Sequence, residues 1–215
     1  MSNYPFVTDN ALPSAGKTVG IQPRSAWFGA LVAAIGYIIA ISLFLRVPIF
    51  SGFDLGFGER GDGIIDISIL EHWRNVFGGV SSWRSSFYFY PYTGTLGYND
   101  GYLLYGVVYS FWRMFADPFH SDTLNILTFK TIGYVGSYLL VSRTLNWGRY
   151  PAVLVALLFT IASNISLQAV HAQLQSIALL PVALILAVSM VRAEADGRTL
   201  RARSLAIGLS SLMAA

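Results

Sequence analysis

The sequence contains no cysteine and few charged residues. Of its 215 residues only 12% are Asp, Glu, Lys or Arg, whereas 54% are hydrophobic. Without cysteine the chain forms neither disulfides nor a thiolate metal site. With so few charges it also lacks the polar surface that would cover a water-soluble globule. The composition therefore predicts a membrane protein whose main solvent is lipid.

Basic residues are scattered, although the net charge is +3. Nucleic-acid-binding surfaces concentrate Lys and Arg in a patch or along a helix, so we expect no nucleic acid partner. The three histidines, His72, His120 and His171, lie far apart and lack the spacing of a zinc motif such as H-E-x-x-H. The sequence therefore gives little support to a zinc site.

Long apolar runs dominate the rest of the chain. The run 27–45 holds nineteen residues without a charge, which at a rise of about 1.5 Å per residue matches the ~30 Å hydrocarbon core of a bilayer. It predicts a first transmembrane helix after a disordered cytoplasmic tail at 1–26. Further runs predict three more spans and a truncated fifth: Leu124–Val141, Pro151–Ile165, Ser176–Val191 and Ser204–Ala215.

The stretch Gly101–Phe115 decides the topology. It contains Arg113 and has fifteen residues, below the ~17 that a span needs. If it lies on the surface, eight basic residues of short segments share one side of the membrane, in agreement with the positive-inside rule. We therefore predict an interfacial helix here, a cytoplasmic N-terminus and a location in the plasma (inner) membrane.

The consequence is a 77-residue extracytoplasmic loop at 46–122, followed by a helical membrane bundle at 123–215. Long loops between membrane helices usually bind or catalyse. The loop also carries eight of the eleven acidic residues: Asp54, Glu59, Asp62, Asp66, Glu71, Asp100, Asp117 and Asp122. The predicted fold is an all-α integral membrane protein with about five transmembrane helices, the last truncated, and a large first loop that carries juxtamembrane helices.

Two carboxylates start a predicted helix directly after the first span. Asp62 and Asp66 are four residues apart, so both lie on one helical face. Clustered carboxylates repel, which favours a base near neutral pH or a cation site. The structural alternative is that Asp62 caps the helix and Asp66 is a solvated surface residue.

Aromatic residues alternate in the second half of the loop. Tyr90, Tyr92 and Tyr98 could stack on sugar rings, or could gather at the membrane interface. Asp100 could cap the next helix or supply a second carboxylate. Lys130 lies inside the second predicted span, where its ammonium must either snorkel outward or face an internal cavity and pair with a lipid phosphate.

These features resemble the amino-terminal region of bacterial polytopic membrane proteins of the GT-C glycosyltransferase superfamily, which use lipid-phosphate-linked sugars. The resemblance covers residues 27–215. It rests on Gly61-Asp62-Gly63 after the first helix, on the F-Y-P-Y-x-G-T-L-x-Y segment Phe89–Tyr98, and on the segment Tyr138–Leu145 that leads into the next turn.

The resemblance implies a transferase for hexosyl or pentosyl groups. In the family a first-loop carboxylate acts as general base on the acceptor hydroxyl, which attacks the sugar C1 and expels a polyprenyl phosphate with inversion; Asp62 is the matching position. Some members use a divalent cation, for which Asp66 and Asp100 are candidates, whereas others use none. Lys130 is the candidate lipid-phosphate ligand, and Tyr90, Tyr92 and Tyr98 are candidates for sugar stacking.

Two further alternatives follow from the number of spans, which is smaller than in that family. The chain is then either a fragment, which could be inactive alone, or works with a partner subunit that supplies further helices. The other alternative function is a non-catalytic membrane subunit that binds or translocates a lipid-linked sugar carrier.

Overall fold

The computed structural model describes residues 23–55, 61–86, 89–98, 101–162 and 172–214. Within these residues all regular structure is helical and there is no strand, so the predicted all-helical class is confirmed. The α-helices are α1 (Pro23–Phe44), α2 (Arg46–Phe50), α3 (Asp62–Phe77), α4 (Leu103–Trp112), α5 (Pro118–Leu139), α6 (Arg149–Ile161), α8 (Leu180–Ala195) and α9 (Thr199–Ala214). Shorter helical turns are η2 (Leu96–Tyr98), the π-helical turn η3 (Leu140–Thr144) and the 3-10 helix η4 (Ala172–Leu179).

Among the described residues, three helical segments are long and apolar enough to cross a membrane: Trp27–Phe44, Pro118–Thr144 and Leu174–Ala195. The predicted count of five spans is not confirmed. Helix α6 has 13 residues, about 20 Å at 1.5 Å per residue, which is short of the ~30 Å core. Helix α9 carries Arg201 and Arg203 in its first turns.

Two predicted segments lie partly outside the described residues. Of the tail 1–26, residues 1–22 are not described, while 23–26 already belong to α1. The predicted run Pro151–Ile165 passes beyond residue 162, where the described part of the chain stops before resuming at 172.

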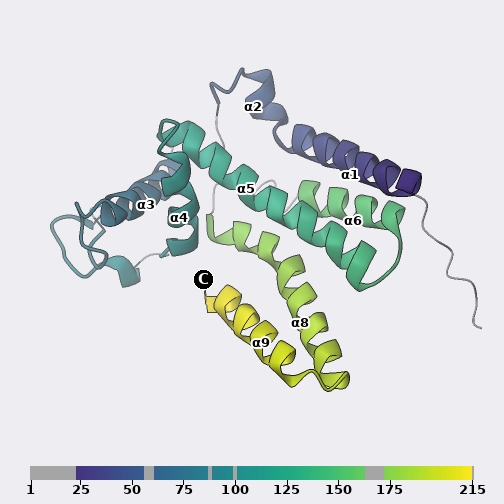
Figure 1. Cartoon of the computed structure of the whole chain (residues 1–215). Coiled ribbons are helices and arrows are strands. Elements are labelled where there is room, and N and C mark those ends of the chain that lie inside the picture. Colours follow the sequence, from purple (N-terminus) through teal and green to yellow (C-terminus); the bar gives the residue numbers. More distant parts are fainter. Residues whose placement is uncertain (1–22, 56–60, 87–88, 99–100, 163–171, 215) are drawn as a thin grey trace, which may run out of the picture.

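Helix α5 lies at the centre of the molecule. Figure 1 shows it running across the middle, with α1 and α6 along it, α3 and α4 at its N-terminal end, and the α8–α9 hairpin near its other end. Two glycines on α5 allow close packing. A Cβ atom at Gly133 would lie 3.0 Å from the Phe159 side chain on α6, and one at Gly136 would lie 3.1 Å from Val182 on α8. Small residues at such contacts are typical of membrane helices, which associate by close packing.

Helix α1 packs on α5 through two tyrosines. The hydroxyls of Tyr37 and Thr131 are 2.7 Å apart, and the Tyr134 hydroxyl donates a 2.8 Å hydrogen bond to the carbonyl oxygen of Ala33. Helix α1 also packs along α6. Its remaining face is apolar and uncovered, with large exposed side chains at Trp27, Phe28, Leu31, Ile35, Ile38, Ile39 and Leu43. Such a surface is suited to contact with lipid.

Helices α3 and α4 pack on each other and on the N-terminal half of α5. Their shared core contains Leu70, Trp73, Tyr105 and Phe129. Gly106 sets the close approach of the two helices, since a Cβ atom there would lie 2.5 Å from Cβ of Trp73. The predicted interfacial segment Gly101–Phe115 therefore contains a helix, but one face of it packs against protein and only the other remains exposed.

Candidate functional site

Asp62 is the first residue of α3 and lies at the surface. The N-cap position belongs to Gly61, so the alternative in which Asp62 caps the helix is not what the structure shows. A negative charge in the first turn is stabilised by the positive end of the helix dipole. An exposed carboxylate held in this way is accessible to a substrate hydroxyl.

Asp66 lies one turn further along α3 and is buried, with 8% of its surface exposed. The alternative in which it is a solvated surface residue is therefore wrong. Its carboxylate is close enough to that of Asp122 on α5 for the two to interact electrostatically. Two neighbouring carboxylates repel when both are ionised, so this pair favours a shared proton or a bound cation. Asp122 belonged to the acidic loop predicted from the sequence, but nothing local pointed to this pairing.

A divalent cation would need more ligands than the described residues provide. In the described part of the chain there is no group of three or more His, Cys, Asp or Glu side chains able to hold a metal ion. Asp66 and Asp122 supply two carboxylates, whereas Ca²⁺ takes about six to eight oxygens and Mg²⁺ demands an octahedral set. The predicted further carboxylate, Asp100, lies outside the described residues. The described residues by themselves therefore do not fit a divalent cation.

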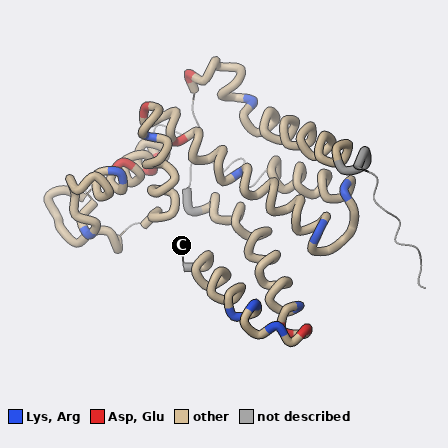
Figure 2. The backbone as a smooth tube through the Cα atoms, in the orientation of Figure 1, with Lys and Arg blue, Asp and Glu red and all other residues tan. Residues whose placement is uncertain are grey.

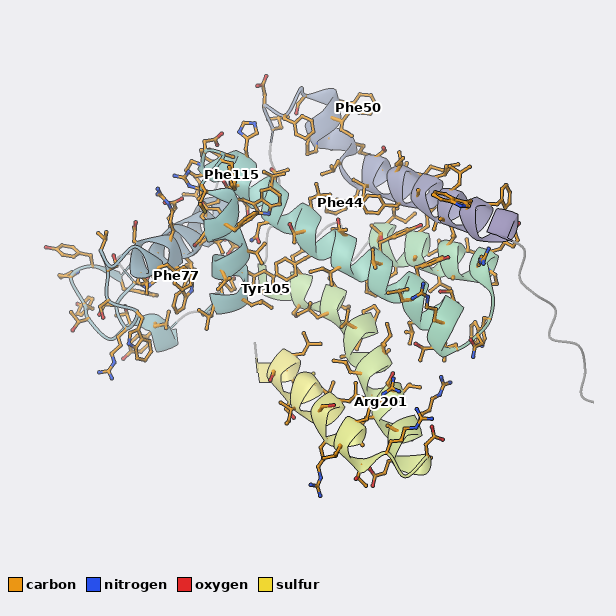
Figure 3. The ribbon with its side chains drawn as sticks, in the orientation of Figure 1. Phe44, Phe50, Phe77, Tyr105, Phe115 and Arg201 are labelled. Atoms are coloured by element: carbon orange, nitrogen blue, oxygen red, sulfur yellow. The ribbon has the colours of Figure 1, made fainter. Side chains whose placement is uncertain are left out.

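Lys130 is buried on α5, two helical turns beyond Asp122. Its surface is 3% exposed, and Nζ lies 4.4 Å from the centroid of the Phe44 ring at the end of α1. Figure 3 labels Phe44 at the point where α1 ends beside α5. Among the described residues Nζ has no hydrogen-bond partner. The side chain therefore does not snorkel, and within the described part of the chain its ammonium contacts the face of an aromatic ring.

The space beside Lys130 is small. A cavity of about 10 Å³ is lined by Lys130, Gly133, Phe159, Thr160, Ile177 and Ala178. That volume holds at most one water molecule, so a lipid phosphate would reach the ammonium only after the helices had separated. Other buried polar atoms without a partner in the described part of the chain are Asn125 Oδ1 and both side-chain polar atoms of Gln175.

A charged cluster joins α3 to α4. Glu71 accepts hydrogen bonds from the Tyr109 hydroxyl at 2.6 Å, from Nε of Arg113, and from Nη1 of Arg74 at 3.1 Å. Arg113 also donates a 2.6 Å hydrogen bond to the carbonyl oxygen of Ala116. Burial opposes ionisation of Glu71, but the three hydrogen bonds outweigh it and hold the pKa of Glu71 below its usual value. Burial and the adjacent Glu71 carboxylate both raise the pKa of Tyr109.

This cluster could not be found from the sequence. Glu71 and Arg113 are 42 residues apart, and no local pattern connects them. In the sequence Arg113 indicated only that the helix around it does not span a membrane. Figure 2 shows that most acidic residues of the described part of the chain lie on α3 and around the start of α5, with basic residues among them.

The predicted sugar-stacking residues are all exposed. Tyr90, Tyr92 and Tyr98 are 85%, 75% and 80% exposed, and they belong to the segment between α3 and α4. This segment leaves α3 at the end opposite to Asp62, about 22 Å along the helix axis at 1.5 Å per residue, and Figure 1 shows it at the outer end of the molecule. The structure therefore does not gather these rings and Asp62 at one end of α3.

These observations define a class of protein: a chain whose described part is helical and contains three helices long and apolar enough to cross a membrane. The sequence matches no family model, and comparisons with curated proteins and with solved structures find no match. A narrower assignment is therefore a proposal, argued below from the residues.

Proposed function

We propose that this chain is a multi-pass membrane glycosyltransferase of the GT-C type, with its N-terminus in the cytoplasm. It transfers a sugar from a polyprenyl-phosphate donor to an extracytoplasmic acceptor. The supporting observation is the position of Asp62, exposed at the start of α3, a helix that follows the first candidate span and packs on α4 and α5. A donor anchored in lipid is cleaved at the membrane surface, so the base has to be held there in a fixed orientation.

In the proposed reaction Asp62 takes the proton of the acceptor hydroxyl as that oxygen attacks the sugar C1. The bond between C1 and the phosphate oxygen breaks, polyprenyl phosphate leaves, and the anomeric configuration inverts because attack comes from the opposite face. Positive charge develops on the sugar ring in such reactions. The carboxylates of Asp66 on α3 and Asp122 on α5 carry one negative charge between them when they share a proton, and this charge stabilises the positive charge on the sugar.

The test is sugar transfer by the full chain in proteoliposomes that contain a polyprenyl-phosphate sugar donor. We expect Asp62→Asn to lower the transfer rate by about 10²–10⁴-fold, the usual contribution of a general base, without lowering membrane insertion. Asp54→Asn is the matched control, because Asp54 is also an exposed carboxylate between α1 and α3, and it should leave the rate unchanged. Unchanged transfer by Asp62→Asn would exclude Asp62 as the base.

Lys130 favours a second candidate function, that of a non-catalytic subunit which binds or translocates a lipid-linked sugar carrier together with a partner subunit. A buried ammonium without a hydrogen-bond partner in the described part of the chain is costly in a membrane helix and is usually retained for function. This function predicts that polyprenyl-phosphate binding survives Asp62→Asn and falls with Lys130→Ala. Loss of transfer with Asp62→Asn alone would favour the enzyme.

A further inference from the structure

A groove lies between the C-terminal ends of α3 and α4, away from the residues of the proposed reaction. Its volume is about 470 Å³. Two arginines line it, Arg74 on α3 and Arg113 at the end of α4. The other lining side chains are mostly apolar: Phe77, Ser110, Phe111 and Met114. Asp62 precedes Arg74 by twelve residues on α3, about 18 Å along the helix axis.

The two arginines have more positive charge than Glu71 neutralises and more N–H donors than it can accept from. Both guanidinium groups bond to Glu71, so the three side chains together carry one net positive charge. Arg74 donates through Nη1, and Arg113 through Nε and Nη1. Since a guanidinium has five N–H donors, each arginine keeps donors without a partner in the described residues. Such donors match the oxygen atoms of a phosphate.

The exposed face of α4 continues the groove with apolar side chains. Leu103, Val107 and Phe111 follow one another at intervals of four residues and are each about half exposed, and beyond the helix Met114 and Phe115 are 73% and 70% exposed. Figure 3 labels Phe77 on α3 and Phe115 just past the end of α4. An uncovered stripe of this kind is typical of a helix that lies in the membrane interface.

The position of the groove along the chain also favours a location in the membrane interface. Met114 lies four residues before Pro118, where the second candidate span begins. With Pro118–Thr144 across the bilayer, the guanidinium groups would lie near the membrane interface, with apolar side chains directly beside them. An occupant with a phosphate at one end and acyl chains at the other meets both requirements.

We infer that this groove binds an anionic membrane phospholipid. The phosphate accepts hydrogen bonds from Arg74 and Arg113, and an acyl chain lies over Phe77, Phe111 and Met114. The net positive charge of the arginine–glutamate cluster selects anionic headgroups over zwitterionic ones. Binding of this lipid does not depend on the proposed transfer reaction, since the groove contains none of the residues assigned to it.

The experiment is native mass spectrometry of the purified full chain, titrated with phosphatidylglycerol and with phosphatidylcholine. We expect Arg74→Gln to weaken phosphatidylglycerol binding about tenfold, as for the loss of one charge-assisted hydrogen bond. Arg84→Gln is the matched control: Arg84 is another exposed arginine of the same loop, placed over the Trp83 ring at 5.1 Å. It removes the same charge and should change binding by less than about twofold, as expected for a screened surface charge.

A second variant tests the apolar part of the groove. Met114→Asp places a carboxylate in it and should also weaken phosphatidylglycerol binding. Arg74→Gln and Met114→Asp should both unfold at the wild-type temperature in lipid-free detergent. Met114 is exposed, and the exposed Arg74–Glu71 bridge contributes little to stability.

Three results would overturn the inference. Equal weakening by Arg74→Gln and Arg84→Gln would show diffuse attraction to the loop. Unchanged binding in both Arg74→Gln and Met114→Asp would show that the lipid sits elsewhere. If free glycerol phosphate bound as tightly as phosphatidylglycerol, the site would serve a soluble anion and not a lipid.

Discussion

The Tyr109 hydroxyl on α4 donates a 2.6 Å hydrogen bond to Oε1 of Glu71 on α3. Close to this bond, Trp73 of α3 lies against Gly106 of α4, so a polar contact and a tight apolar contact occur within one interface. The Trp73 indole also donates a hydrogen bond to the carbonyl oxygen of Gly101. These contacts fix α3, and with it Asp62, relative to α4.

Tyr109→Phe should destabilise the chain by about 1.5–3 kcal/mol, because it removes a buried hydrogen bond to a charged acceptor. The Tyr109 side chain is fully buried, so water does not replace the lost donor. Thermal unfolding in detergent, followed by circular dichroism, measures the change. Tyr98→Phe is the control, since Tyr98 is exposed and its loss of a hydroxyl should leave the unfolding temperature unchanged.

Acid should weaken the α3–α4 interface through Glu71. The pKa of Glu71 lies below its ordinary value of 4.5 in the folded chain, so the folded state binds the proton less readily than the unfolded state. The stabilisation is fully present above pH 4.5 and is lost as the pH falls through the lower, folded-state pKa. Unfolding temperatures measured across this range should show the loss in the wild type, and Glu71→Gln should lack that component. An identical acid dependence in both proteins would contradict the assignment.

Gly106→Ala should destabilise the chain by about 1–3 kcal/mol, the usual cost of overpacking. The new methyl group would meet Trp73 at 2.5 Å, so the two helices would have to separate. Gly208→Ala in α9 is a matched control, because it is the same change within a helix and its Cβ would meet nothing within 4 Å. Alanine is favoured over glycine in helices by roughly 0.5–1 kcal/mol, so the control should be neutral or stabilising. In the same unfolding assay Gly106→Ala should therefore lower the stability and Gly208→Ala should not.

Lys130→Met should stabilise the chain, because methionine fills a similar volume without a buried charge. In the centre of a membrane helix a lysine costs about 2.5–3.5 kcal/mol relative to insertion of an apolar residue, and the Phe44 contact offsets part of that cost. The unfolding temperature in detergent should rise. If it falls instead, Lys130 has a stabilising partner beyond the described residues.

The cores of the predicted spans were the most predictable part of the fold. Uncharged runs such as Trp27–Leu45 are recognisable from composition alone, and α1 occupies this one. Helix starts were less accurate. Helix α5 begins at Pro118, six residues before the predicted run, because Asp117 accepts hydrogen bonds from the backbone amides of Phe119 and His120 and Pro118 occupies the first turn. A search for runs of apolar residues does not detect this capping signal, although the sequence contains it.

The candidate site was less predictable than the helices. The spacing of Asp62 and Asp66 correctly predicted that both lie on one helix. It did not predict that Asp62 is exposed and Asp66 is buried. Asp66 is buried because α5 passes over that part of α3 and brings Asp122 near it, and no local pattern reports such a contact between distant residues. For the same reason the clustering of Glu71 with Tyr109 and Arg113 could be seen only in the folded chain.

The contact between Lys130 and Phe44 has a consequence for biogenesis. A ribosome delivers α1 to the bilayer long before α5, and α5 would enter lipid with an uncompensated ammonium if it inserted alone. With α1 already in place, the ring of Phe44 is available to that ammonium. We therefore expect α5 to insert less efficiently when α1 is deleted.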